Sequence, residues 1–432
     1  MAQAISARPD QAERDFFSDP ALIAEPIAYF NQMRSKCPVA RESYHGAFMV
    51  TGYAELNDLL TRKSEEYSSA LSILGPLPAL PFTPEGSDIS AQLDAVREEL
   101  PWSAHLVCFD GQKHTDHRAV LTKLLTYKRL KQNEAYLESL ADTLIDRFIG
   151  KGRCNVVPEY GHATTTYAIS DLMGIPEADR PVLLEAIGAP PSQIEGDAEM
   201  KIGPDPLIGM KELFDGYLRD RIANPGSDLM SELVASQFRD GAEIPFETLS
   251  HLARFLFGAG QDTTSHLISM SIKQLAERPE LQQRLRADPS RIPDFIEEVL
   301  RFDPPVKVAY RLAMHDTRLA GVDVPAGSVM TACLVGANHD PAQFENPEEF
   351  NIDRPGVRDH MSFSKGLHAC PGAPLGRMEC RIALERILTR TSEIRLSEEH
   401  HGPSGARRFN FVPTYTFRSL IDLHIEFTPA GA

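Results

Sequence analysis

The chain has 432 residues, a formal net charge of -17 at pH 7 and 42% hydrophobic residues. This length predicts either two domains or one large domain, and the core is large enough to bury a cofactor. The strong negative charge argues against a nucleic-acid surface and against binding to anionic membranes through the bulk of the protein.

Cysteine usage and the first residues of the chain predict its compartment. Residues 1–17 are polar and charged, without the apolar segment of a signal peptide and without a twin arginine. The cysteines are scattered without paired spacing, which is typical of a reducing compartment. They are Cys37, Cys108, Cys154, Cys333, Cys370 and Cys380. We therefore expect a soluble cytoplasmic protein that does not bind a membrane.

The first part of the chain predicts short elements and one long loop. Residues 1–19 are expected to form a loose leader, and residues 48–51 a strand that is followed by a helix over 53–60. The stretch 73–87 is rich in glycine and proline and lacks periodicity, and a charged segment follows it to residue 99. Together these two segments indicate a long functional loop or lid.

Helical spacing dominates the rest of the chain. Residues 114–222 have a nearly continuous helical pattern, and longer and shorter helices are predicted over 246–277 and 291–302. The breaks in the first of these regions lie at Gly150, Pro158, Pro176 and Pro190-Pro191. Strand patterns are confined to 306–313, 328–334 and 408–427. The sequence thus predicts a mainly α fold with a minor β part.

The most informative segment is Phe363-Ser364-Lys365-Gly366-Leu367-His368-Ala369-Cys370-Pro371-Gly372. Pro371 suits a first helical position, so the segment is expected to deliver the Cys370 thiol to the start of a helix over 373–390. Free N–H groups and the helix dipole would lower the pKa of this thiol and prepare a metal ligand or a nucleophile. A lone cysteine is more often a small buried apolar residue. A zinc site with His368 is the third interpretation, although such sites normally use four ligands in recognisable pairs.

The spacing F-x-x-G-x-H-x-C-x-G resembles the haem-binding loop of the cytochrome P450 family. This resemblance implies that Cys370 is the proximal ligand of the iron of haem b, with Phe363, Gly366 and Gly372 shaping the loop. It also implies the fold of that family, in which the haem lies between the long central helix and the helix after the cysteine loop. Residues 1–432 would then form a single haem domain. The N-terminal membrane anchor of microsomal members is not expected here, so the chain is similar to bacterial members.

A second motif lies inside the longest predicted helix. Residues 257–264 read Phe-Gly-Ala-Gly-Gln-Asp-Thr-Thr, and each interior glycine costs a helix about 1 kcal/mol relative to alanine. Local rule-breaking of this kind is common at functional sites. The segment is similar to the oxygen-activation motif A/G-G-x-D-T of the family. By that resemblance Thr263 would hydrogen-bond dioxygen and Asp262 would relay protons.

Charged residues complete the resemblance. Glu298 and Arg301 match the E-x-x-R motif of the family, and Arg354 would be the later arginine that locks the pair, which gives these residues a structural role. His114 and Arg118 match H-T-x-x-R. With Arg311 and His368, they would bind the two carboxylates of haem, whereas His117 lies off the pattern and has no predicted role.

The resemblance implies a haem-thiolate monooxygenase that inserts one atom of O2 into its substrate. Electrons would come from NAD(P)H through a ferredoxin reductase and a ferredoxin, and a monomer is expected. A peroxide-driven peroxygenase is one alternative, although such members usually lack the acid-threonine pair. A haem-binding sensor without turnover is another.

The resemblance also suggests pocket walls, most of them apolar. They are Phe255, Gly258, Ala259, Val306, Val308, Thr416 and Phe417. With a lid over 73–107 that includes Trp102, these residues predict a compact hydrophobic substrate such as a terpenoid, an alkylaromatic compound or a steroid. Lys307 either anchors a carboxylate or points to solvent.

A basic cluster interrupts the acidic chain. It consists of Lys123, Lys128, Arg129 and Lys131, with Lys113, Lys365 and Arg377 as possible additions. By resemblance it lies on the cysteine side of the haem, where it would attract an acidic ferredoxin. A solvated basic face is the alternative.

Overall fold

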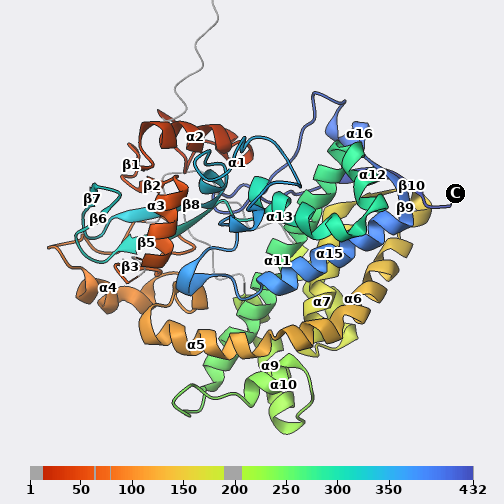
Figure 1. The fold of residues 1–432 in the computed structure, drawn as a ribbon. Coiled ribbons are helices and arrows are strands. Elements are labelled where there is room, and N and C mark those ends of the chain that lie inside the picture. Colours follow the sequence, from red (N-terminus) through yellow and green to blue (C-terminus); the bar gives the residue numbers. More distant parts are fainter. Residues whose placement is uncertain (1–12, 63–64, 78, 189–206, 432) are drawn as a thin grey trace, which may run out of the picture.

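The computed structural model describes residues 13–62, 65–77, 79–188 and 207–431. Helices make up most of the molecule, and a sheet-containing part lies at the end where α1 and α2 are found (Figure 1). The helices are α1 Ala21–Ala24, α2 Ile27–Lys36, α3 Tyr53–Asn57, α4 Ser90–Val96, α5 Gly111–Leu124, α6 Tyr127–Asp146, α7 Ala163–Met173, α8 Arg180–Gly188, α9 Lys211–Ala223, α10 Leu229–Val234, α11 Phe246–Glu277, α12 Pro279–Ala287, α13 Ile292–Phe302, α14 Leu334–Asn338, α15 Ala373–Arg390 and α16 Glu398–His401.

The strands form small sheets. They are β1 Val39–Arg41, β2 Phe48–Val50, β3 Tyr67–Ser68, β4 Arg153–Asn155, β5 Val308–Ala313, β6 Thr317–Leu319, β7 Val322–Val324, β8 Val329–Cys333, β9 Thr391–Leu396 and β10 His424–Pro429. One sheet has the order β1-β2-β8-β5-β3, and in it only β2 and β8 run parallel. A second sheet has the order β4-β10-β9, and β6 pairs with β7. The mainly α class with a minor β part is therefore confirmed.

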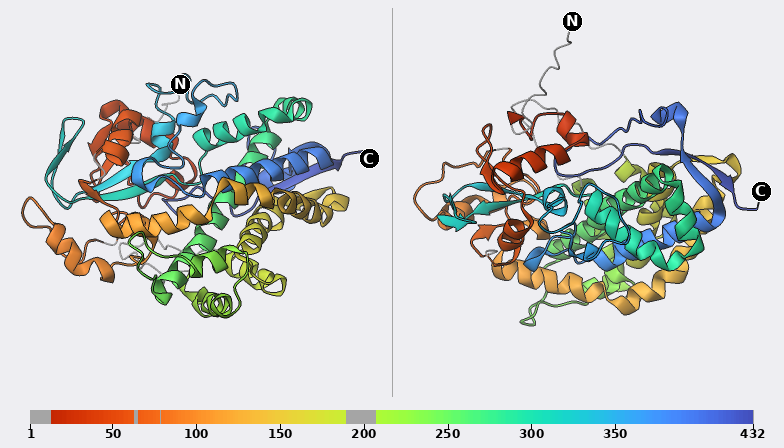
Figure 2. Two further views of the ribbon diagram at one scale, coloured as in Figure 1. Left: turned by 60° about the horizontal axis from the view of Figure 1, so that its bottom comes forward. Right: turned by 45° about the horizontal axis from the view of Figure 1, so that its top comes forward.

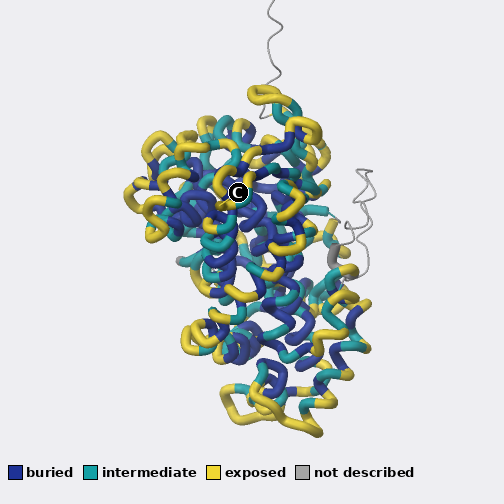
Figure 3. The backbone as a smooth tube through the Cα atoms, turned by 90° about the vertical axis from the view of Figure 1, so that its right-hand side faces the viewer, coloured by how far each residue is buried: buried dark blue, intermediate teal, exposed yellow. Residues whose placement is uncertain are grey.

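The long helix α11 crosses the helical part and packs against α7 and α15. Its bounds, Phe246–Glu277, are those predicted from the sequence. Figure 2 shows α5 and α6 along one side of the molecule, and α15 packs beside α6. Apolar residues of α6, α11, α13 and α15 share one cluster, which holds Leu144, Ile268, Phe295 and Ile387 among others. The buried residues follow this interior and the exposed residues lie on the periphery (Figure 3).

Some predicted boundaries differ from the structure. Phe16 and Phe17 are buried in an apolar cluster with Tyr29 and Phe30, so this part of the predicted leader is packed rather than loose. Residues 1–12 and the predicted break at Pro190-Pro191 lie outside the described residues. The predicted loop over 73–99 contains α4, whose residue Leu93 is fully buried.

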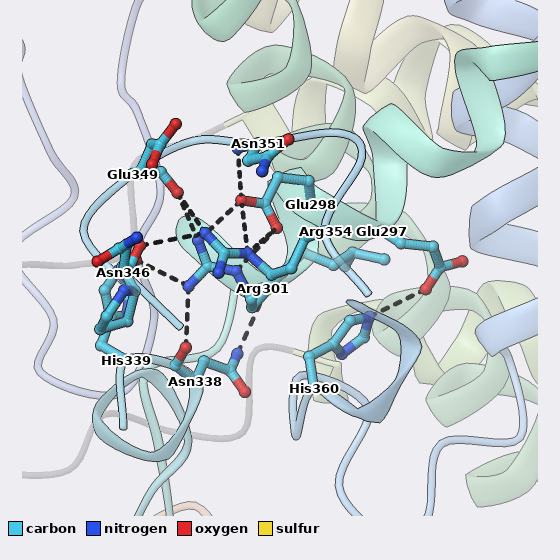
Figure 4. Close-up of polar contacts among 12 residues, drawn as sticks. Glu297, Glu298, Arg301, Asn338, His339, Asn346, Glu349, Asn351, Arg354 and His360 are labelled. Atoms are coloured by element: carbon cyan, nitrogen blue, oxygen red, sulfur yellow. Dashed lines mark hydrogen bonds and ion pairs between the residues drawn. The ribbon is translucent and has the colours of Figure 1, made fainter. Parts of the chain in front are cut away.

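A buried ion network holds α13 to the segment that leads toward Cys370 (Figure 4). Arg301 Nε and Nη2 each donate to the Glu298 carboxylate over 2.8 Å, and neither side chain is exposed. Arg354 Nε lies 3.3 Å from the same carboxylate. Arg301 also donates to the carbonyls of Asn338 and Pro347 over 3.0 and 2.9 Å. This geometry supports the structural role predicted for Glu298, Arg301 and Arg354.

Removing the Glu298 carboxylate should therefore destabilise the folded protein. In Glu298→Ala two buried guanidinium groups lose their counter-charge, and breaking a buried ion pair in this way costs about 3–5 kcal/mol. We expect Glu298→Ala to aggregate or to unfold well below the wild-type temperature, as measured by thermal denaturation. The exposed Glu280 of α12 provides the control, because Glu280→Ala leaves no buried charge. A wild-type melting temperature in Glu298→Ala would contradict the structural role.

Candidate functional site

The backbone of the cysteine loop adopts a conformation that requires a glycine. Gly366 has a φ of +67°, and a Cβ at this position would lie 2.2 Å from the carbonyl oxygen of Leu60. Only glycine fits this close approach without a shift of the backbone. The Cys370 N–H donates to the carbonyl of Phe363 over 2.8 Å, which closes the loop. The Arg377 guanidinium lies 4.4 Å from the centre of the Phe363 ring and braces it.

The helix after the loop has the predicted bounds, but Pro371 does not take a first helical position. Pro371 and Gly372 form a turn, α15 starts at Ala373, and Pro374 occupies the first helical turn. Burial raises the pKa of the Cys370 thiol, and this effect exceeds the lowering by the N–H groups of Gly372 and Ala373 and by Arg118. The expectation of a lowered thiol pKa is therefore wrong for the protein alone. A bound metal ion deprotonates such a thiol outright.

Cys370 is accessible although protein surrounds it closely enough to raise its pKa. Ala259, in the middle of α11, is also exposed, whereas residues 264–275 of the same helix are all buried. The two elements are in contact just beyond these residues: a Cβ on Gly376 of α15 would lie 3.1 Å from Oγ1 of Thr264. The accessible thiol and the accessible helix face therefore belong to two neighbouring parts of the fold that pack against each other.

Cationic side chains predicted to bind haem are gathered beside the cysteine loop. The rings of His114 and His368 lie 4.0 Å apart, and the Arg118 guanidinium donates to the carbonyl of Ala369. Arg311, from β5, donates to Oγ of Ser72 over 2.9 Å. The Nε2 of His368 lies 3.0 Å from Oγ of Ser69.

In the described part of the chain neither Arg118 nor Arg311 forms an ion pair with a carboxylate, although the charge of Asp110 acts to raise the pKa of Arg311. Burial lowers the pKa of Arg311 to about 10. Burial, followed by Arg311, His114 and Arg118, lowers the pKa of His368 to about 2. Buried cations of this kind require an anion. The two carboxylates of haem supply such charge, so the residues present fit this cofactor.

The predicted oxygen-activation motif forms an ordered hydrogen-bond arrangement in α11. Thr263 Oγ1 donates to the carbonyl of Ala259 over 3.0 Å. Oδ1 of Asp262 lies 3.0 Å from Nε2 of His266 and 3.6 Å from Nε2 of His162. Burial alone would raise the pKa of Asp262, but the two histidines outweigh it and hold this pKa well below its usual range.

Sequence reasoning missed both histidines. His266 follows Asp262 by one helical turn, and this spacing was a usable signal. His162 ends the helical segment η6, Val157–His162, which packs against α11. No local pattern identified it, because the contact depends on tertiary structure.

The predicted pocket residues separate into groups. Phe255 lines a cavity of about 240 Å³ together with Leu106, Phe109 and His117, and its ring lies 5.7 Å from that of His105. Gly258 is covered by Leu207, since a Cβ there would lie 2.5 Å from a methyl carbon of that side chain. The structure therefore keeps Phe255 and the exposed Ala259 on the accessible side of α11.

The remaining pocket residues lie on and beside β5. Val306 is bridged to Phe417, and the carbonyl of Thr416 accepts hydrogen bonds from the N–H groups of Lys307 and Val308. Val308 is fully buried in the cluster that contains Phe16 and Tyr29. Because side chains alternate along a strand, Val308 faces away from Arg311. Placing Val308 in the pocket is corrected accordingly, and Ala309 lies on the same face of the strand as Arg311.

Lys307 fits neither of its two interpretations. It is fully buried, and its amine donates to the carbonyls of Thr414 and Ile23 over 2.9 and 3.2 Å. Burial lowers its pKa well below the usual value. Lys307 therefore joins the C-terminal segment to the N-terminal segment.

The basic cluster is only partly free. Arg129 pairs with Glu232 and Lys131 pairs with Glu134. Lys123 and Lys128 are exposed, and among the described residues no acidic partner is found for them. Tyr127 exposes 78% of its surface, so an apolar group lies beside Lys128 in sequence. The unpaired positive charge of this cluster is therefore smaller than its number of lysines and arginines suggests.

Searches among known proteins agree with the geometry. The family model described as Cytochrome P450 matches residues 217–399. Cytochrome P450 144 of Mycobacterium tuberculosis is 31% identical over 381 residues, which cover 87% of this chain and 85% of the relative.

Solved structures are also similar. Substrate-free CYP150A6 of Mycobacterium marinum has 42% identity and a TM-score of 0.91, over 98% of this chain and 100% of the other. CYP109E1 of Bacillus megaterium in complex with testosterone has 25% identity and a TM-score of 0.76, over 93% of this chain and 99% of the other. In the described residues no helix is long and apolar enough to cross a membrane.

Proposed function

This chain belongs to the cytochrome P450 family of haem monooxygenases, and we propose that it oxygenates a compact hydrophobic substrate with electrons from a separate ferredoxin. The observation that carries the proposal is the packing of α15, which follows the accessible Cys370, against α11 at Thr264, beside two partly or fully buried arginines that form no ion pair within the described residues. We further propose haem b, bound in a single domain and in the cytoplasm. All six cysteines are free, which supports a reducing compartment.

Each residue has a defined task in this proposal. Haem supplies the activation of O2 when it is bound. Cys370 would hold the cofactor, Arg118 and Arg311 would neutralise its carboxylates, and His114 and His368 would donate hydrogen bonds to them.

The delivery of protons is the task of Thr263 and Asp262 on α11. The Thr263 hydroxyl donates to the carbonyl of Ala259 and can accept at the accessible face of α11, and it can donate there once it releases that carbonyl. The Asp262 carboxylate moves a proton toward that hydroxyl. This pair favours O2-dependent turnover over a peroxide-driven reaction, which has no need for such proton control.

The substrate class follows from the walls of the site. Phe255 and Ala259 offer apolar surface, and Lys307 offers no free charge, because its amine is bound to two carbonyls. A carboxylate anchor is therefore not expected at Lys307. The similar CYP109E1 is solved with testosterone, which supports a steroid, a terpenoid or an alkylaromatic compound as the substrate class.

The thiolate assignment is tested by Cys370→Ala. Without the sulfur ligand, the ferrous-CO complex should lose the red-shifted Soret band that thiolate ligation produces. Cys380→Ala is the matched control, because the Cys380 thiol is fully buried and 3.5 Å from Oγ of Ser271. If Cys370→Ala keeps the red-shifted band, another residue binds the iron.

Proton control is tested by Thr263→Ala. Substrate binding and O2 reduction do not need the hydroxyl, so NADH consumption should continue while hydrogen peroxide replaces product. We expect product per NADH to fall at least about tenfold, within the range that general acid–base groups contribute. Thr263→Ser should restore coupling, and Thr264→Ala, which alters the neighbouring buried hydroxyl, should keep it. Full coupling in Thr263→Ala would refute the role.

The docking face is tested by the double variant Lys123→Glu with Lys128→Glu. Reduction by an acidic ferredoxin should slow, and it should also slow as salt rises, because exposed charges are screened beyond about 8 Å at physiological ionic strength. Substrate binding should be unchanged. Lys151→Glu with Arg153→Glu changes the charge equally beyond the other end of α6, a helix of 20 residues that spans about 30 Å. Equal slowing in both double variants would refute a docking site at Lys123 and Lys128.

A further inference from the structure

Three side chains with metal-binding atoms lie close together at the oxygen-activation motif of α11. They are His162, Asp262 and His266, and their ligand atoms all lie within 4.8 Å of one another. The Asp262 oxygen is 3.0 Å from one imidazole nitrogen and 3.6 Å from the other. Within the described parts of the chain this is the only group of at least three such residues. Nothing in the monooxygenase chemistry above requires two histidines at this carboxylate.

The local structure explains why these atoms meet. Asp262 and His266 are four residues apart on α11, so they project from the same face of the helix. This is the spacing with which a helix presents two ligands to zinc in the H-E-x-x-H motif. The third group comes from η6, which packs across α11 at this point. Two ligands from one helix and one from a neighbouring element form a rigid, preorganised set.

The chemistry of the donors selects the kind of ion. Two imidazole nitrogens and one carboxylate oxygen suit Zn²⁺ and similar transition metals, whereas Mg²⁺ and Ca²⁺ prefer oxygen ligands. His162 Nε2 is buried without a hydrogen bond in the structure, because the Asp262 oxygen is too distant. A metal ion between them would satisfy this nitrogen.

The site also has an entrance. The Asp262 side chain is 47% exposed, whereas the side chains of His162 and His266 are 12% and 3% exposed. An ion would enter from the Asp262 side and keep water as its fourth ligand, which is the arrangement of open zinc sites with three protein ligands.

We propose that His162, Asp262 and His266 bind a divalent transition metal of the Zn²⁺ class, and that this ion removes Asp262 from proton delivery. The first half of the proposal depends only on these three side chains. The second half rests on the function proposed above, since it takes Asp262 as the proton relay. A bound ion would hold the carboxylate against the histidines, and the site would thus inhibit coupled turnover.

Binding is measured directly on the tag-free, haem-loaded protein after treatment with EDTA and dialysis. Titration with ZnCl2 in a calorimeter should show one site per chain. His162→Gln, Asp262→Asn and His266→Gln should each weaken Zn²⁺ binding at least about tenfold, since even indirect supports of a metal site contribute that much.

The controls separate this site from other histidines and from misfolding. His400 and His424 stack 3.7 Å apart and form another place where zinc could bind. His400→Gln should leave the affinity of the strong site unchanged. Asp262→Asn keeps the size of the side chain, so the test stands even if the buried His266→Gln does not fold. Absence of a strong site in the wild type, or its loss in His400→Gln but not in the three ligand variants, would overturn the proposal.

A second measurement tests whether the bound metal ion inhibits coupled turnover. Zn²⁺ should lower product per NADH in the wild type and should not lower it further in Asp262→Asn. Reduction of cytochrome c by the reductase and ferredoxin alone must be unaffected by the same Zn²⁺ concentration. If Zn²⁺ binds as expected but leaves coupling intact, the metal site stands and the proton-relay role of Asp262 fails.

Discussion

The buried carboxylates of α13 are the constraint on which the rest of the structure depends. Glu298 binds Arg301 and Arg354 and thereby fixes the segment that leads into the cysteine loop. The adjacent Glu297 accepts from Nε of Arg377 over 2.6 Å and lies 3.0 Å from Nε2 of His360. Two consecutive acids on one helix thus hold the approach to the cysteine loop and the helix that follows it.

Glu297 is ionised for a clear physical reason. Burial raises its pKa, but the hydrogen bonds from His360 and Arg377 outweigh this effect and lower it to about 2. The charge therefore persists through the neutral range and keeps Arg377 over the Phe363 ring. Figure 4 shows both acids and the groups around them. Because an ion pair that loses one partner leaves a buried charge, the network is sensitive to single changes and fixes the loop in one arrangement.

Local sequence patterns predicted much of this architecture, and tertiary contacts account for the rest. The bounds of α11 and the strands β2, β5 and β8 were recognisable from periodicity. By contrast, β9 and β4 flank β10 only through pairings between residues far apart in the chain, which no local pattern encodes. The same limit applies to the site. Motif spacing singled out Cys370 and Thr263 for the proposed site, whereas it gave no role to Glu297.

The cysteine side and the α11 side of the site carry opposite charges. On the cysteine side Arg118 and Arg311 form no ion pair within the described residues, and burial lowers the pKa of Arg311 and of His368. The α11 side has the opposite arrangement, because Asp262 is an anion held by two imidazoles. A cofactor with two carboxylates would balance the positive charge on the cysteine side and would leave the charge on the α11 side unchanged. Haem would therefore complete the electrostatics of the cysteine side, while the acid on α11 would keep its charge for the proton relay proposed above.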